Sequence, residues 1–153
     1  MPGAGLFPIH TDKLTFGRDG RWYADGEPVL HPRLASFFSR HLRRKPDGTY
    51  EIWVDERFHA DVEVEDTPFV VVDVDSATDG ALMLVLNDGT SEPLAGSGLR
   101  VTADESLSCA VKDGRYRARL LRPAQQRLEP LIEAIADSFE IRSGSRRYPI
   151  HAD

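Results

Sequence analysis

The stretch DVEVEDTPFVVVDVD, residues 61–75, decides the fold of this chain, because its pattern is that of two strands that meet at a proline. Val62 and Val64 alternate with acidic residues, which is the period-two pattern of a strand with one solvated face. The apolar run over residues 69–72 has no polar alternation and is typical of a buried central strand. Pro68 lacks a backbone donor, so we expect the break between the two strands there.

The residues upstream of this stretch predict a hairpin, a helix and a further strand. The pair Asp19-Gly20 supplies the backbone conformation of a tight turn between two short strands. Pro32 suits the first turn of a helix, and apolar residues at helical spacing continue to about residue 44, so this helix is expected to pack on a sheet. The alternation over residues 49–54 predicts a strand that leads into the opening stretch.

The residues downstream predict further strands. A strand is expected over residues 81–86. Residues 107–112 are expected to pair with residues 115–120 across the turn Asp113-Gly114, because this dipeptide is typical of tight hairpins.

A second helix is predicted near the C-terminus. Pro123 opens it, and apolar residues keep helical spacing as far as Phe139. Pro130 lies inside this pattern and is expected to kink or split the helix. A short strand over residues 147–150 is then expected to close the sheet.

These elements predict an α+β fold of mostly antiparallel strands in mixed, roll-like sheets with two helices. We expect two small subdomains, an N-terminal α+β subdomain over residues 13–78 and a β-rich one with one helix over residues 79–153. The polar loop over residues 76–80 is the best boundary between them. Residues 1–12, rich in proline and glycine, are expected to form a disordered lead-in. No internal repeat is visible in the sequence.

The composition limits the classes of function. Among the 153 residues, 19 are Lys or Arg and 25 are Asp or Glu, and this net charge of -6 disfavours binding to nucleic acids or anionic membranes. No apolar run reaches the ~18 residues of a membrane span. Cys109 is the single cysteine, which excludes an intramolecular disulfide and a cysteine-based zinc cluster. These features favour a cytoplasmic protein.

The motifs of nucleophilic and nucleotide chemistry are not found in the sequence. It contains no G-x-S-x-G, no phosphate-binding P-loop, no G-x-G-x-x-G and no H-E-x-x-H. Cys109 shares strand parity with Leu107 and Val111, so we expect its thiol to point into the core rather than to act as a nucleophile.

Four potential metal ligands share one face of a predicted strand, namely His59, Asp61, Glu63 and Glu65. Neighbours on one strand face stand ~6.8 Å apart, which is too far to chelate one ion closely. Mg²⁺ and Ca²⁺ ligands normally converge from several loops. We therefore favour a solvated sheet face, and we predict neither a metal nor a cofactor.

Three arginines, Arg115, Arg117 and Arg119, share one face of another predicted strand, with an apolar face behind them. Like charges along one strand repel, so we expect a negative charge or water to offset this repulsion. The alternatives are the acidic row on the residue 59–65 strand, an anionic partner, or a solvated face.

The proline corner has two interpretations. In the structural one, which we favour, Asp66 bonds local amides and fixes the corner while Phe69 enters the core. In the functional one, Asp66 and Asn87 lie beside Trp22 in a cleft between the subdomains.

Several of these segments also carry a family resemblance. They are the corner Glu65-Asp66-Thr67-Pro68-Phe69, which is the most specific part, and residues 18–23, 31–44, Tyr50, 62–70, Asn87, 99–101, 111–114 and 143–144. Over about residues 14–150, the sequence resembles the bacterial family called domain of unknown function 1285. The resemblance implies a compact α+β fold of two small subdomains in a bacterial cytoplasmic protein, and it implies no activity. Arg142 departs from the family, which tends to have an apolar or aromatic residue there, so a shared C-terminal site is not implied.

The interpretation we favour is a non-enzymatic binding or regulatory module, because no catalytic groups converge in the sequence. The alternative is a small enzyme that acts on an anionic metabolite through the arginines and one carboxylate. The expected partner is a small anionic ligand or a protein, with a homo-oligomer among the alternatives, and neither a membrane nor nucleic acid is expected. The ligand-binding residues predicted are Asp66, Asn87, Arg115, Arg117, Arg119 and Trp22.

Overall fold

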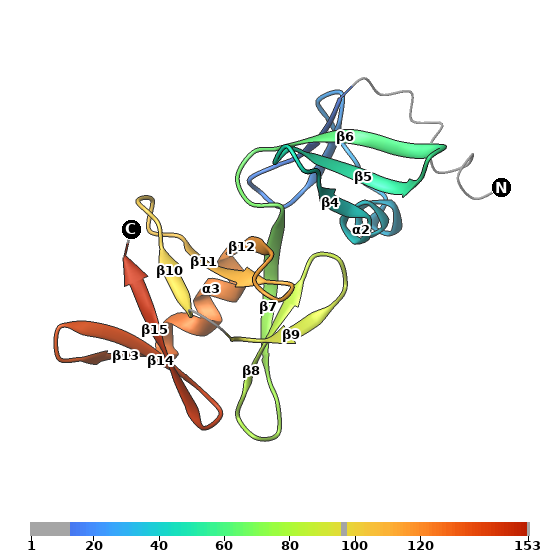
Figure 1. Ribbon diagram of the computed structural model, residues 1–153. Coiled ribbons are helices and arrows are strands. Elements are labelled where there is room, and N and C mark those ends of the chain that lie inside the picture. Colours follow the sequence, from blue (N-terminus) through green and yellow to red (C-terminus); the bar gives the residue numbers. More distant parts are fainter. Residues whose placement is uncertain (1–12, 96–97, 153) are drawn as a thin grey trace. The chain divides into compact units, whose positions relative to one another are not determined.

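The computed structural model describes residues 13–95 and 98–152 (Figure 1). The lead-in expected over residues 1–12 lies outside the described residues. The chain divides into two compact units, Met1–Pro68 and Phe69–Asp153. The division therefore falls at the proline corner, whereas the sequence placed a boundary after residue 78. The buried strand of the opening stretch belongs to the second unit.

Over its described residues, 13–68, the first unit has a six-stranded mixed sheet and one helix, and its strand order is β3-β2-β1-β6-β5-β4. Its elements are β1 (Leu14–Phe16), β2 (Trp22–Ala24), β3 (Glu27–Pro28), α2 (Pro32–Arg40), β4 (Leu42–Arg44), β5 (Tyr50–Asp55) and β6 (Phe58–Val64).

The described part of the second unit has a nine-stranded mixed sheet and one α-helix, with the strand order β13-β14-β15-β10-β11-β12-β7-β8-β9. Its strands are β7 (Phe69–Ser76), β8 (Leu82–Leu86), β9 (Ser91–Pro93), β10 (Leu99–Val101), β11 (Leu107–Val111), β12 (Tyr116–Leu120), β13 (Ile132–Ile135), β14 (Ser138–Ser143) and β15 (Arg146–Ala152). Helix α3 (Arg122–Leu128) and the 3-10 turn η1 (Glu129–Leu131) connect β12 to β13.

The two units share one strand order that the sequence does not reveal. In the first unit, a three-stranded meander, a helix and a second meander follow one another, and β1 and β6 lie side by side in parallel. In the second unit, β10 to β15 and α3 repeat this arrangement, with β10 and β15 in parallel. The extra meander β7-β8-β9 joins through a parallel pairing of β7 with β12.

An aromatic cluster forms the core of the first unit. The ring of Trp22 lies 5.0 Å from that of Phe16 and 5.3 Å from that of Phe38, measured between centroids. Nε1 of Trp22 donates a hydrogen bond of 2.9 Å to Oγ of Ser39, which is also buried. The indole therefore has a partner for its polar atom as well as an apolar surrounding.

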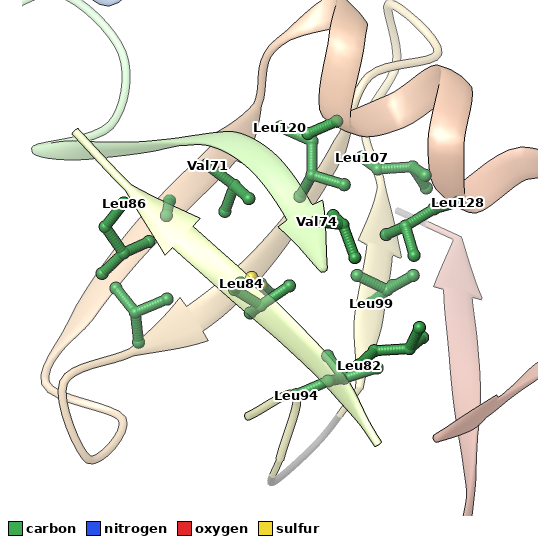
Figure 2. Close-up of a cluster of buried hydrophobic side chains, with 14 of the residues drawn as sticks. Val71, Val74, Leu82, Leu84, Leu86, Leu94, Leu99, Leu107, Leu120 and Leu128 are labelled. Carbon is green, nitrogen blue, oxygen red and sulfur yellow. The ribbon is translucent and has the colours of Figure 1, made fainter. Parts of the chain in front are cut away.

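An aliphatic cluster forms the core of the second unit, and Figure 2 shows its side chains converging from several strands and from helix α3. Cys109 belongs to this cluster and is fully buried, as its strand parity predicted. The labelled members are Val71, Val74, Leu82, Leu84, Leu86, Leu94, Leu99, Leu107, Leu120 and Leu128.

Helix α2 ends earlier than the predicted residue 44. His41 leaves helical geometry, with φ -106 and ψ 6, and residues 42–44 form a strand that pairs with β5. On that strand, Arg43 bonds Glu51 at 2.9 Å between Nε and Oε2, and its guanidinium lies 4.3 Å from the Trp53 ring centroid. These cross-strand contacts stabilise residues 42–44 as a strand although their apolar spacing is helical. The predicted extension of the helix to residue 44 is therefore wrong.

The second predicted helix is wrong beyond Leu128. Pro130 lies in η1, where its missing donor and its ring prevent a continuous helix. The chain then forms the hairpin β13-β14, in which Ile132 lies opposite Ile141. Most of the described chain is strand, so the α+β class holds only coarsely, although the two helices and the hairpin at Asp113-Gly114 are confirmed.

Candidate functional site

Arg117 and Arg119 lie on β12 with the parity that the sequence predicted, and Arg115 lies in the turn just before this strand. Ala118 and Leu120, on the other face of this strand, are buried in the core. Arg115 is exposed, and Arg117 and Arg119 are half-buried.

Two of the three arginines are held by the hairpin itself. Nε of Arg115 donates to the carbonyl oxygen of Lys112 at 3.1 Å. A terminal nitrogen of Arg117 donates to Oγ of Ser108 on the neighbouring strand β11 at 2.5 Å. These contacts place Arg115 and Arg117 within the hairpin, and Arg119 lies nearest to helix α3.

Arg119 lines a groove between the end of β12, helix α3 and the turn that precedes β11. The groove has a volume of about 360 Å³ and is also lined by Arg122, Gln126, Asp104 and Glu105, among others. Pockets that hold small molecules have volumes of about 300–1,000 Å³. The groove is thus large enough for a small polar ligand.

Gln125 builds this groove by joining three elements. Its Oε1 accepts a hydrogen bond from the backbone nitrogen of Leu107 at 3.1 Å. Its Nε2 donates to the carbonyl oxygen of Glu105 at 3.3 Å and to Oε1 of Glu129 at 3.1 Å. The turn, strand β11 and helix α3 are therefore fixed relative to one another around the groove.

The charges of the groove are of both signs. Asp104 accepts hydrogen bonds from the hydroxyl groups of Thr102 and Ser106, so the turn itself uses this carboxylate. Among the described residues, no acidic side chain lies within ion-pair distance of Arg122. The arrangement can receive an anionic group at the arginines and hydrogen-bond donors at the acidic side.

A second cluster in this unit, which the sequence did not predict, surrounds Lys112. Its Nζ lies 2.6 Å from Oδ2 of buried Asp88 and 3.0 Å from Oγ1 of Thr90. Its backbone N–H points at both carboxylate oxygens of Glu92, at 3.1 and 3.2 Å. Lys112 has a φ of 56, in the left-handed region that is uncommon for residues other than glycine. This cluster joins the meander β7-β9 to the hairpin β11-β12.

The electrostatics of Asp88 follow from its contacts. Burial disfavours its charged form, but hydrogen bonds from Lys112 and Thr90 outweigh that effect, and the pKa of Asp88 lies below its ordinary value. Asp88 is therefore ionised at neutral pH, and we assign the cluster a structural role.

The other predicted ligand-binding residues belong to both units. Trp22 is only 2% exposed in the core of the first unit, and Asp66 of the same unit lies 3.6 Å from Arg18. Asn87 belongs to the second unit, where its Oδ1 accepts from the backbone nitrogen of Val70 at 3.0 Å beside the β7-β8 register shift. Within their own units, Trp22 and Asn87 have evident structural roles.

The acidic row has local partners in the first unit. Asp61 lies 2.7 Å from Nζ of Lys45, and Glu63 lies 2.7 Å from Nζ of Lys13. Glu65 accepts a hydrogen bond from the backbone nitrogen of Arg18 at 3.0 Å. Within residues 13–95 and 98–152, no three His, Cys, Asp or Glu side chains are placed to hold one metal ion.

The Cys109 thiol and the two helices were also considered in the sequence predictions. Burial raises the pKa of the Cys109 thiol to about 12, so this group stays protonated and is a poor nucleophile. Neither of the two described helices has the length and apolar character needed to cross a membrane.

The chain is similar to two solved structures. A DUF1285 family protein from Silicibacter pomeroyi DSS-3 has a TM-score of 0.68 and 23% identity, with 92% of this chain and 80% of that chain covered. A DUF1285 family protein from Shewanella baltica OS155 has a TM-score of 0.56 and 22% identity, with 71% of this chain and 84% of that chain covered. No protein-family model and no curated protein matches the sequence.

Proposed function

Because the chain has the fold of the DUF1285 family, whose name assigns no activity, we propose its function from its own residues. It is a non-enzymatic binding or regulatory module, and the groove of the second unit holds a small ligand with an anionic group. The observation that carries this proposal is that Arg119 and Arg122 line one groove together.

The two arginines support an anionic ligand. A guanidinium presents a planar fork of donors that fits a carboxylate or a phosphate group. Arg122 is exposed and has no ion-pair partner among the described residues, so binding would not have to break an existing pair. Gln126 adds amide groups that can bond the uncharged part of a ligand.

The composition of the groove supports binding rather than catalysis. Its described lining holds no histidine, cysteine, lysine or tyrosine, so the candidate proton-transfer groups there are carboxylates. Of these, Asp104 and Glu129 already accept hydrogen bonds from neighbouring side chains. Of the ligand-binding residues predicted from the sequence, the proposal keeps Arg119, and it adds Arg122 and Gln126.

Thermal unfolding in the presence of inorganic phosphate, citrate or glutamate tests the proposal. A ligand that binds only the native state stabilises it by about 2.7 kcal/mol at a hundredfold excess over its dissociation constant. We expect at least one probe to raise the unfolding temperature of the wild type and of the control variant Arg115→Gln. The same probe is expected to have no effect on Arg122→Gln.

Two results of this experiment would contradict the proposal. If no probe stabilises the wild type, or if Arg122→Gln responds as the wild type does, the groove is not the site of an anionic ligand. The alternative function, a small enzyme, requires that a stabilising probe be consumed, which NMR spectra of the mixture over time would show.

A further inference from the structure

The four outer strands of the two sheets differ in how they resist pairing with another chain. An outer strand exposes unpaired backbone groups, and proteins usually blunt it with proline, charge or short length. Pro28 ends β3 and Pro93 ends β9, whereas β4 carries exposed Arg43 and Arg44. Strand β13, with the sequence Ile-Glu-Ala-Ile, has no proline and a single charge, Glu133, and with 4 residues it is the longest of these outer strands. It is the least protected edge in the described residues.

Exposed apolar side chains lie near this edge. Leu131, Ile135 and Phe139 are 44%, 37% and 54% exposed, and they are three of the four large hydrophobic residues that are exposed in the described chain. Phe139 lies opposite Ala134 on one side and opposite Ile150 on the other, so these three share one face of the sheet, whereas Ile135 lies opposite Ser138 on the other face. Exposed apolar side chains therefore flank this edge on both faces, and grouped exposure of this kind is more typical of interaction surfaces than a single apolar side chain is.

The hairpin determines which backbone groups point outward. Ile135 and Ser138 are the last pair before a two-residue turn, and such a turn closes on a hydrogen-bonded pair. Bonded and non-bonded pairs alternate, so the N–H and C=O groups of Ala134 point away from β14. The N–H of Ile132 is already bonded to the carbonyl oxygen of Glu129. Ala134 therefore offers one outward donor and one outward acceptor at the centre of the edge.

We propose that β13 pairs antiparallel with β13 of a second copy of this chain, with Ala134 on the two-fold axis. The two alanines then exchange both of their outward backbone hydrogen bonds. On the same face, Phe139 of each copy flanks the alanine pair, and its exposed ring gains apolar surroundings.

Charge selects this register. The outward backbone groups could also pair if Ile132 lay opposite Ala134 of the second copy. That register would place Glu133 directly opposite Glu133 of the second copy, and like charges in opposite positions repel. With Ala134 on the axis, each Glu133 lies opposite Ile135 of the second copy. Its carboxylate also has a partner in its own copy, Arg147 on β15, at 3.3 Å.

Sedimentation equilibrium on the full chain tests the proposal. We expect the wild type to have twice the mass of one chain. Ala134→Lys and Ala134→Glu each place like charges opposite one another, and each is expected to weaken association roughly tenfold or more. A mixture of the two variants places opposite charges across the axis and is expected to form dimers again. Ser91→Lys, on the outer strand β9, is the matched control and is expected to remain dimeric.

A second variant covers the case in which Ala134→Lys fails to fold, as judged by circular dichroism. Phe139→Ser removes an exposed ring without changing the edge, and it is expected to weaken the dimer while leaving the spectrum unchanged. A wild type that is a monomer at submillimolar concentration would overturn the proposal and leave the edge for a strand of another protein. Folded Ala134→Lys chains that dimerise as the wild type does would overturn it as well.

Discussion

The two units of this chain arrange their strands in the same order but fill their cores with different side chains. Rings of Phe16, Trp22 and Phe38 pack together in the first unit. Aliphatic residues fill the core of the second unit, where an extra meander is added to the shared arrangement. What the two share is the pairing of the first strand with the last, with Leu14 beside Val62 in one and Leu99 beside Ile150 in the other. Apolar residues thus occupy this junction in both units, with Leu14, Val62 and Leu99 buried and Ile150 half-buried, although the sequence is not repeated.

The two units also differ in how they place their charges. The acidic row of the first unit meets lysines at the surface, and the side chains of Lys13 and Glu63 are 60% and 54% exposed. In the second unit, the side chains of Lys112 and Asp88 are 22% and 4% exposed. Water screens the first kind of pair and hardly reaches the second, so their contributions to stability should differ.

The largest effect is expected from Trp22→Ala, which removes the centre of the aromatic core. Deleting a buried aromatic side chain costs about 3–5 kcal/mol of unfolding free energy, because it leaves a cavity. The control Leu30→Ala alters a side chain that is 82% exposed and should leave stability unchanged. Urea unfolding followed by the fluorescence of Trp53 measures both. An equal response of the two variants would mean that the ring cluster does not hold the first unit together.

An intermediate effect is expected from Lys112→Met, because Asp88 would remain buried without its cation. An unsatisfied buried polar group costs about 1–3 kcal/mol. The double variant Lys112→Met/Asp88→Asn is expected to lose less stability than the sum of the two single variants, since the residues act as a pair. Additive losses in urea unfolding would contradict this coupling. Lys45→Met, in the exposed pair with Asp61, serves as the matched control.

The same pair makes a prediction about pH. The pKa of Asp88 is lower in the folded state than its ordinary value of about 3.9, so its stabilising effect is complete above that value. The effect is lost as the pH falls below about 4 towards the folded pKa. Unfolding free energies measured across this range should therefore fall more steeply for the wild type than for Asp88→Asn.

The elements that the sequence predicted correctly are those whose pattern has one structural solution. The alternation before Pro68, the apolar run after it and the turn Asp113-Gly114 each lead to one local structure, and β6, β7 and the β11-β12 hairpin are found there. The helical spacing that continues to Phe139 predicted a helix, but beyond Pro130 the chain instead pairs β13 with β14 and β14 with β15. The apolar spacing of these residues alone did not reveal that pairing.

The candidate site shows the same limit. The parity of β12 identified Arg119, but Arg122 and Gln126 lie on helix α3 and join it in the groove through the fold. Lys112 and Asp88 are 24 residues apart, and the turn that contains Asp88 has the composition of an ordinary surface turn. Neither grouping follows from spacing along the chain, because each depends on which strands are neighbours.

The smallest effect is expected from Glu63→Gln, which removes one carboxylate of the exposed acidic row. Lys13 loses its ion pair but stays hydrated, and salt screens exposed charges over about 10 Å at 0.1 M ionic strength. We expect the urea midpoint of this variant to match that of the wild type at both low and high salt. A loss as large as that of Lys112→Met would mean that the surface row stabilises the first unit as strongly as the buried pair stabilises the second. The contrast between the units would then lie in their cores alone.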